Sequence, residues 1–501
     1  MRQETDALGV RSLPEGALYG IHTARAAENF PVSGQPVAPE LIRAYALVKA
    51  ACALANLDTG HLDPGRAEAI VAACREVAEG RHADQFIVDA FQGGAGTSTN
   101  MNLNEVVANR ALELLGRAPG DHGFCSPLDH VNLHQSTNDT YPTALRVAAL
   151  QLLKELEGTT ARLQEALQAK EAEFAQVVKV GRTELMDAVP MTLGMTFGAY
   201  AEAVSRDRWR IFKCRERIKQ VPLGGTAVGT GLGAPRAYIF KAAEHLRHLT
   251  GLPVSRAENL VDATANADAF VEVSGILSAY AANLLKIASD LRLLASGPAT
   301  GLGEIRLPAL QAGSSIMPGK VNPVIPECVG QTALRVMGNH QTVTLTAGLG
   351  QLEINQYMPL LAHSLLESLH LLRDASTVFA DKCITGITAD EGRCQELVDK
   401  SQALATVLVP ALGYDTVSRL LAASRQAGRT LTAHMAATGV LAEADAAGLL
   451  TPKRMRKLGF EEEDYECLRR PGEALPLLDL SAGGGTPPDP RTDAMDGKEK
   501  K

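Results

Sequence analysis

The segment 268–296 constrains the fold of this chain more than any other part of the sequence. It reads DAFVEVSGILSAYAANLLKIASDLRLLAS, is apolar nearly all round in its middle, and is interrupted by Glu272, Lys286 and Asp290. It is far longer than an ordinary helix of about 11 or 12 residues. A helix with so little polar face is expected to be buried among other helices.

Four further long segments carry helical patterns. In 142–178 the leucines are spaced by seven and four, which keeps them on one face of an amphipathic helix. Asp139 or Thr140 is expected to cap the start of this helix, with Pro142 in its first turn. The remaining segments are 190–218, 323–348 and 355–382. Together the five predict a long helical bundle whose excess apolar surface packs against the bundles of other subunits.

Composition supports an all-α fold. Hydrophobic residues make up 46% of the chain but aromatic residues only 4%, so the cores must be aliphatic, which favours packed helices over a sandwich or barrel. Shorter helices are predicted at 39–58 and 64–80, each beginning with a proline. The predicted division is a mostly helical N-terminal domain, the central bundle, a small helical domain and a disordered tail, at 1–138, 139–385, 386–470 and 471–501.

Charge and cysteine usage exclude several classes of protein. The net charge of −8, without a dense basic run, argues against nucleic-acid binding. Apolar stretches fall short of the roughly 20 residues that span a bilayer, and the N-terminus carries acids where a signal peptide would be apolar. The eight cysteines lack a CxxC pair and are interpreted as reduced thiols. A cytoplasmic protein with no membrane partner is expected.

Four polar islands lie at the ends of the predicted bundle helices. They are GGAGTSTNMNLNE (93–105), HVNLHQSTNDTYPT (130–143), VGRTELMDAVPMTLG (180–194) and GSSIMPGKVNP (313–323). Clusters of Ser, Thr and Asn commonly form caps and turns, which is the alternative interpretation of each island taken alone. Together, neutral donors and one lysine suit the binding of a small dicarboxylate.

The islands carry a resemblance to a known family. GSSIMPGKVNP resembles the signature loop of the aspartase/fumarase superfamily, whose members are lyases that eliminate a group anti to a proton beside a carboxylate. FQGGAGTSTNMN and QSTND resemble the aspartate ammonia-lyases of that superfamily more than its class II fumarases. The resemblance implies reversible elimination of ammonia from L-aspartate to give fumarate. Fumarate hydration, a changed amine substrate and a non-catalytic helical scaffold are the alternatives.

The resemblance also implies residue roles and an assembly. Ser314 is expected to be the base, acting as an alkoxide in a mobile loop, with an aci-carboxylate as the intermediate. Eight other residues are expected to bind substrate: Thr97, Ser136, Thr137 and Ser315 at the β-carboxylate, Thr183, Lys320 and Asn322 at the α-carboxylate, and Asn138 at the amino group. A homotetramer whose sites are shared between subunits is implied. No cofactor is expected to be required, and activation by a divalent cation such as Mg²⁺ is left open.

One position departs from the family pattern. Glu184 stands where the family usually has His or Gln after GRT, and Glu327 would normally be the partner of that side chain. Two facing carboxylates cannot both stay ionised cheaply without a cation between them. Glu184 is therefore either a protonated stand-in for Gln or a ligand of the substrate ammonium. His245 and His248 share a helix face, but without further ligands no metal site is predicted.

Overall fold

The computed structural model describes residues 1–461 and 463–465. The chain divides into two compact units. The first contains Met1–Ala169, Ala199–Ser296 and Leu307–Ile387, and the second contains Lys170–Gly198, Gly297–Arg306 and the chain from Thr388 onward. The predicted tail, 471–501, lies outside the described residues, and the predicted domain boundaries stay a prediction.

The first unit begins with a small layer of strands and helices. Its elements are β1 (Arg2–Asp6), β2 (Gly9–Leu13), α1 (Ile21–Asn29), α2 (Pro39–Asp58), α3 (Pro64–Ala78), η1 (Ala83–Gln85), α4 (Thr97–Leu114) and η2 (Pro127–Val131). The strands β1 and β2 form an antiparallel hairpin. Helices α2 and α3 both begin on a proline, as predicted, because the missing N–H of proline is not needed in a first turn.

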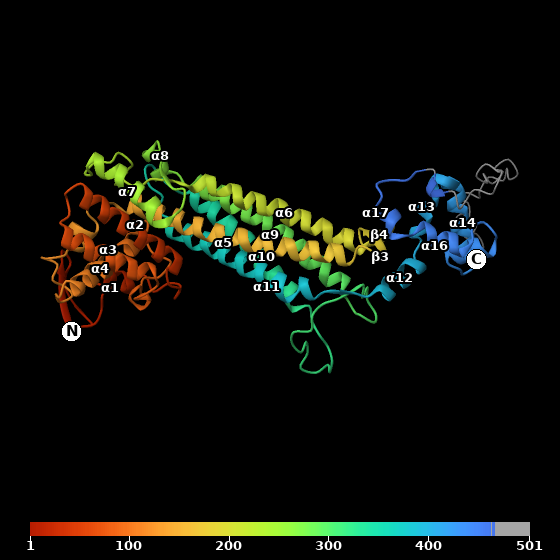
Figure 1. Cartoon of the computed structure of the whole chain (residues 1–501). Coiled ribbons are helices and arrows are strands. Elements are labelled where there is room, and N and C mark those ends of the chain that lie inside the picture. Colours follow the sequence, from red (N-terminus) through yellow and green to blue (C-terminus); the bar gives the residue numbers. More distant parts are fainter. Residues whose placement is uncertain (462, 466–501) are drawn as a thin grey trace, which may run out of the picture. The chain divides into compact units, whose positions relative to one another are not determined.

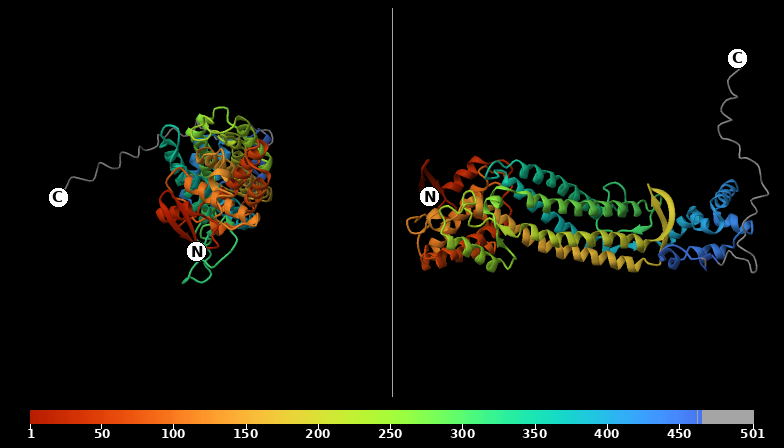
Figure 2. Two further views of the ribbon diagram at one scale, coloured as in Figure 1. Left: turned by 90° about the vertical axis from the view of Figure 1, so that its left-hand side faces the viewer. Right: turned by 90° about the horizontal axis from the view of Figure 1, so that it is seen from above.

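Five long helices form the bundle that the sequence predicts. They are α5 (Thr137–Glu173), α6 (Leu193–Ile218), α9 (Asp268–Leu294), α10 (Val324–Gly348) and α11 (Met358–Lys382). They run side by side in both side views (Figures 1 and 2). The connections hold α7 (Arg236–Thr250), α8 (Leu260–Ala265), η3 (Ile384–Gly386) and a parallel pair of two-residue strands, β5 (Gln220–Val221) and β6 (Ser255–Arg256).

Helix α9 is the predicted apolar helix, and it is long and apolar enough to cross a membrane by length and composition alone. Only 44% of the most apolar 18-residue stretch of this helix is buried inside this chain. Its buried side includes Leu277, Tyr280, Leu284 and Leu291. A core helix of a helical bundle can be equally long and apolar. The buried stripe of α9 packs against α10 and α11.

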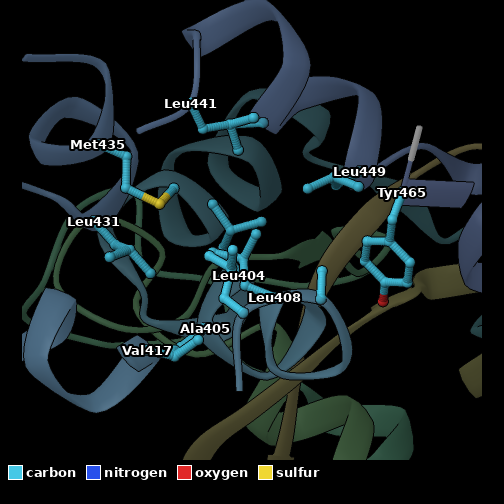
Figure 3. Close-up of a cluster of buried hydrophobic side chains, with 12 residues drawn as sticks. Leu404, Ala405, Leu408, Val417, Leu431, Met435, Leu441, Leu449 and Tyr465 are labelled. Carbon is cyan, nitrogen blue, oxygen red and sulfur yellow. The ribbon is translucent and has the colours of Figure 1, made fainter. Parts of the chain in front are cut away.

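The second unit contains a β-hairpin and a group of short helices. Its strands are β3 (Val178–Thr183), β4 (Met186–Thr192), β7 (Ile305–Arg306) and β8 (Thr388–Ala389). Its helices are α12 (Glu391–Lys400), α13 (Ala403–Leu412), α14 (Tyr414–Gln426), α15 (Leu431–Ala437), α16 (Glu443–Leu449) and α17 (Pro452–Arg456). Leu404, Leu408, Met435, Leu449 and Tyr465 meet in its hydrophobic core (Figure 3).

Helix α5 differs from its prediction at both ends. It begins at Thr137, so Pro142 lies inside the helix instead of in the first turn. It ends at Glu173, and Val178 already belongs to strand β3. The expected continuous helix to 178 was wrong because the chain turns after Glu173: the Val177 N–H donates to the Phe174 oxygen, and Val178 begins the strand.

Candidate active site

The first two polar islands meet where α4 and α5 begin. Thr97 is the first residue of α4 and Thr137 the first residue of α5. Asn100 Nδ2 donates a hydrogen bond to Thr137 Oγ1 at 3.0 Å. Before α4, Gly96 has φ +95°, and a Cβ there would lie 2.3 Å from the Tyr141 ring, so only glycine allows this close approach. The structure thus brings together two segments that the sequence only suggested were related.

The predicted hydroxyls of this pair of islands are arranged as donors. Thr137 Oγ1 accepts from Asn100, and Ser136 Oγ accepts from the Asn138 backbone N–H at 3.2 Å. A hydroxyl that accepts one hydrogen bond keeps its own hydrogen for a further acceptor. These two hydroxyls therefore suit a carboxylate. The Asn138 side chain instead donates to the backbone oxygen of Ala227 at 2.7 Å.

A buried lysine lies beneath these islands. Lys49, on α2, is fully buried and donates to Asn132 Oδ1 and Gln135 Oε1, both at 2.9 Å. Asn132 Oδ1 also accepts from Asn100 and Asn104. Burial lowers the pKa of Lys49 to about 8. Sequence reasoning missed Lys49, although a lone lysine in the apolar run 39–58 was the available signal.

Asp139 has a different role from the predicted helix cap. It is wholly buried, and its Oδ1 accepts from the Ser136 backbone N–H at 3.0 Å. Its Oδ2 accepts from the backbone N–H groups of Gly224 and Thr226, at 3.0 and 3.2 Å. Burial raises the pKa of Asp139 to about 6. The carboxylate therefore ties the glycine-rich connection after β5 to the start of α5.

This raised pKa predicts a pH-dependent effect of Asp139→Asn on stability. Between its ordinary pKa of 3.8 and about 6, the folded protein binds the proton more firmly than the unfolded chain, so wild-type stability falls as pH rises. Asparagine does not titrate. Relative to wild type, the free energy of unfolding of the variant should therefore gain about 2 kcal/mol between pH 4 and 7 and change little above that.

Urea unfolding of both proteins at several pH values measures this difference. The exposed Asp129 offers a matched control, since Asp129→Asn removes a carboxylate from the surface. A constant difference between wild type and Asp139→Asn from pH 4 to 7 would contradict the prediction.

The serine loop, 313–323, closes on itself. Ser314 Oγ accepts from the backbone N–H groups of Ile316 and Met317, at 3.2 and 2.9 Å. The Gly313 N–H donates to the Lys320 oxygen at 2.8 Å, and Asn322 Nδ2 donates to the Gly313 oxygen at 2.7 Å. Ser315 and Lys320 are exposed, whereas Ser314 is half-buried. Two backbone donors thus converge on one serine oxygen.

Within the first unit, the serine loop lies at the other end of the bundle from the first two islands (Figure 1). The loop ends at the start of α10, which is 25 residues or about 36 Å long. At the far end of α10, Asn355 Nδ2 donates to the Thr346 oxygen. The following helix α11 carries His363, whose ring lies 5.5 Å from that of Phe91, beside the first island. One chain therefore does not bring Ser314 to Thr97 or Thr137.

The third island is a β-hairpin in the second unit, a structure the sequence did not predict. Strands β3 and β4 pair with Thr183 opposite Met186. The turn residues Glu184 and Leu185 have φ +54° and +67°, which is unusual for residues with a side chain. Strained backbone of this kind costs about 1–3 kcal/mol per residue. The turn exposes Thr183 and Glu184.

Glu327, on the first turn of α10, has a cationic neighbour in its own unit. Arg292 Nη2 lies 3.9 Å from Glu327 Oε1, and both side chains are partly exposed. This arginine supplies positive charge beside Glu327. Glu184 belongs to the second unit, and its predicted pairing with Glu327 stays a prediction.

A metal site does not emerge from the side chains in the part of the chain that the structure describes, where no group of three His, Cys, Asp or Glu residues could hold an ion. His245 Nε2 instead lies 3.0 Å from Asp58 Oδ2, next to Lys241. That contact is a surface ion-pair cluster of the kind that an exposed histidine commonly makes.

Comparison with known proteins identifies the family. The model of a family described as Lyase matches residues 9–338. Aspartate ammonia-lyase of Bacillus sp. is 47% identical over 92% of this chain and 98% of its own length, and that of Escherichia coli (strain K12) is 43% identical over 93% and 98%.

Solved structures agree with this family. A fumarate lyase:delta crystallin from Brucella melitensis, bound to cobalt, is 47% identical with a TM-score of 0.88, and the match covers 91% of this chain and all of that one. The class II fumarase of Schistosoma mansoni is 36% identical with a TM-score of 0.86, covering 91% and 98%.

The chain is therefore a lyase and belongs to this lyase family. Within it, the chain is a member of the aspartase/fumarase superfamily and is more similar to the aspartases than to the class II fumarase. The predicted family membership and the predicted helical-bundle fold are both confirmed.

Proposed function

We propose that this lyase is an aspartate ammonia-lyase, which eliminates ammonia from L-aspartate to give fumarate and runs the addition in reverse. Relatives of that name at 43–47% identity over more than nine-tenths of the chain support this function, as the sequence motifs predict. The observation that carries the proposed chemistry is the serine loop, where two backbone N–H groups point at Ser314 Oγ.

In the proposed reaction, Ser314 acts as an alkoxide that removes a proton from the carbon beside the β-carboxylate. Hydrogen bonds to the charged form of a group lower its pKa, so the Ile316 and Met317 amides favour the alkoxide. The electron pair of the C–H bond passes into the carboxylate to give an aci-carboxylate dianion. Its return forms the double bond and expels ammonia from the neighbouring carbon.

The dianion needs donors aimed at the oxygens where charge develops. Thr97, Ser136, Thr137 and Ser315 are proposed to supply these donors at the β-carboxylate. Thr183, Lys320 and Asn322 are proposed to hold the α-carboxylate, and Asn138 the amino group. The donor arrangement of Ser136 and Thr137 supports this assignment, because each hydroxyl oxygen already accepts a hydrogen bond from the protein.

A homotetramer with shared sites is part of the proposal. The separation of the serine loop from the first two islands within one chain supports a site that is completed by another copy. The bundle also leaves large apolar side chains exposed, among them Leu293 (39%), Leu334 (59%) and Leu345 (67%). Burial of such surface against further copies drives association.

The proposed enzyme needs no cofactor, since the base and the donors all come from the chain. Activation by a divalent cation such as Mg²⁺ stays open, and cobalt is bound by the Brucella melitensis relative. The substrate is a small molecule, and a cytoplasmic location without a nucleic-acid or membrane partner is proposed from the charge and composition.

Glu184 is proposed to contact the substrate ammonium, which favours amine over hydroxyl elimination. Glu184→Gln keeps the size and the hydrogen-bonding capacity but removes the charge. It should weaken deamination of L-aspartate by roughly 1.5–3 kcal/mol, the value of a charge-assisted hydrogen bond. The measurement is kcat/KM of both proteins from pH 6 to 9. Superimposable profiles would instead assign Glu184 as a protonated stand-in for glutamine.

The experiment that tests the function itself is the absorbance of fumarate formed by purified protein. L-Aspartate should give fumarate and ammonia, whereas L-malate and buffer should not. Turnover of L-malate alone would identify a fumarate hydratase, and turnover of neither would favour a changed amine substrate or a scaffold.

A further inference from the structure

A buried ion cluster lies under the third island, within the second unit. Glu304 is fully buried, and its Oε1 accepts from Arg182 Nη1 at 2.7 Å. Its Oε2 lies 3.3 Å from Lys179 Nζ, an ion pair between two side chains that are each at most 5% exposed. Arg182 also donates to the Val180 oxygen at 3.2 Å. One carboxylate thus holds two cations of strand β3.

Glu304 itself is fixed from its other side by α12. Its backbone oxygen accepts from the Asp390 N–H at 2.9 Å. Arg393 donates to the backbone oxygens of Leu302 and Gly301, at 3.0 and 2.9 Å. The backbone of Glu304 is therefore held from the α12 side. Its carboxylate, in turn, holds strand β3 through Arg182 and Lys179.

The held strand leads directly into the strained turn. Gly181 forms an irregularity in the β3–β4 pairing, and a Cβ there would lie 2.7 Å from the Val189 oxygen. Arg182 follows at once, and Thr183 and Glu184 come next, with Glu184 at φ +54°. A turn in this conformation persists only when its surroundings hold it. The ion pair to Glu304 holds Arg182, the residue immediately before Thr183 and the turn.

We infer that Glu304 is a positioning residue for the substrate: it holds Arg182, and through Arg182 it fixes the Thr183–Glu184 turn that meets the α-carboxylate and ammonium. The inference rests on the proposed function for the identity of the substrate. Arg182 has a second carboxylate near it, since its Nε lies 3.9 Å from Asp187 Oδ1, but that side chain is largely exposed and screened by solvent. Glu304 is therefore the buried negative charge beside the two cations. If charge alone mattered, loss of Glu304 would tighten the binding of a dicarboxylate, whereas loss of positioning weakens it.

The test is Glu304→Gln in the assembled, full-length protein. KM for L-aspartate should rise about 10- to 100-fold with kcat changed less than threefold, the pattern expected when binding common to the ground state and the transition state is lost. The amides of 178–192 should also exchange hydrogen for deuterium faster. An unchanged or lowered KM, or unchanged exchange in an active variant, would overturn the inference.

Arg182→Lys gives a second test if Glu304→Gln does not fold, since lysine keeps the charge but lacks the guanidinium geometry. It should raise KM and speed exchange in the same way. Where both single variants fold, their effects should not add in the double variant, because both act through one contact. Additive effects would show that Glu304 does not act through Arg182.

Arg306→Gln is the matched control. Arg306 Nη2 donates to Asp390 Oδ2 at 2.6 Å, so the change breaks a different, exposed ion pair on the same segment. Its KM and its exchange at 178–192 should match wild type, and a change equal to that of Glu304→Gln would assign the effect to the segment as a whole. Failure of the proposed function would appear separately, as wild-type protein that forms no fumarate; the exchange experiment would still decide the positioning role.

Discussion

Ser314→Ala is expected to remove nearly all turnover, by about 10²–10⁴-fold in kcat, while leaving the fold and the assembly unchanged. This is the usual contribution of a positioned base. The side chain is half-buried, and its hydroxyl accepts from backbone N–H groups of its own loop, so its loss should not disturb packing elsewhere. The measurements are fumarate formation and sedimentation of the purified variant.

The same loop geometry would fit a serine that only caps a turn, so a control must separate the two roles. Ser126 provides it, because Ser126 Oγ accepts from the backbone N–H groups of Leu128 and Asp129, at 3.2 and 3.1 Å. Ser126→Ala should cost about 1 kcal/mol of stability, as capping serines do, and leave kcat within a few-fold of wild type. A Ser314→Ala protein that keeps a tenth of wild-type activity would reject Ser314 as the base.

The helices could be predicted where local sequence and tertiary packing agree. Helix α2 begins and ends at the predicted residues, 39 and 58. Its first residue is a proline, which favours a helix start there, and the apolar residues that follow at helical spacing are buried in the fold. At α5 the two disagree. It starts at Thr137, before the predicted cap, and Asp139 instead accepts from the backbone N–H groups of Gly224 and Thr226, which lie far away in the sequence.

The sequence predicts which segments contribute to the site but not how their residues are arranged in space. The hairpin at 178–192 was missed because its turn is Glu184–Leu185, and the Asn-Gly or Asp-Gly pairs that signal such turns are absent. Lys49 was missed for another reason. Its contacts, Asn132 and Gln135, lie in the second island, and no local pattern shows that a lysine on α2 meets them.

Mixing two inactive variants should restore activity if the site is built from different subunits. In one chain, Ser314 and Thr97 lie at opposite ends of the bundle, separated by the length of α10, about 36 Å. Ser314→Ala and Thr97→Ala, unfolded and reassembled together in equal amounts, should therefore complement. A site needs an intact serine from one copy and an intact threonine from another, which random symmetric assembly supplies in about a quarter of sites.

Ser314→Ala mixed with Ser315→Ala is the control for this complementation. Both changes lie in the same loop, so every loop in every mixed assembly carries one defect, and activity should stay at the level of the separate variants. Recovery in the first mixture and none in the second would establish that the serine loop and the first island come from different chains. A tag on one variant verifies that mixed assemblies have formed. If these assemblies recover no activity, the shared site is contradicted, and Ser314 and Thr97 would have to approach each other by movement within one chain.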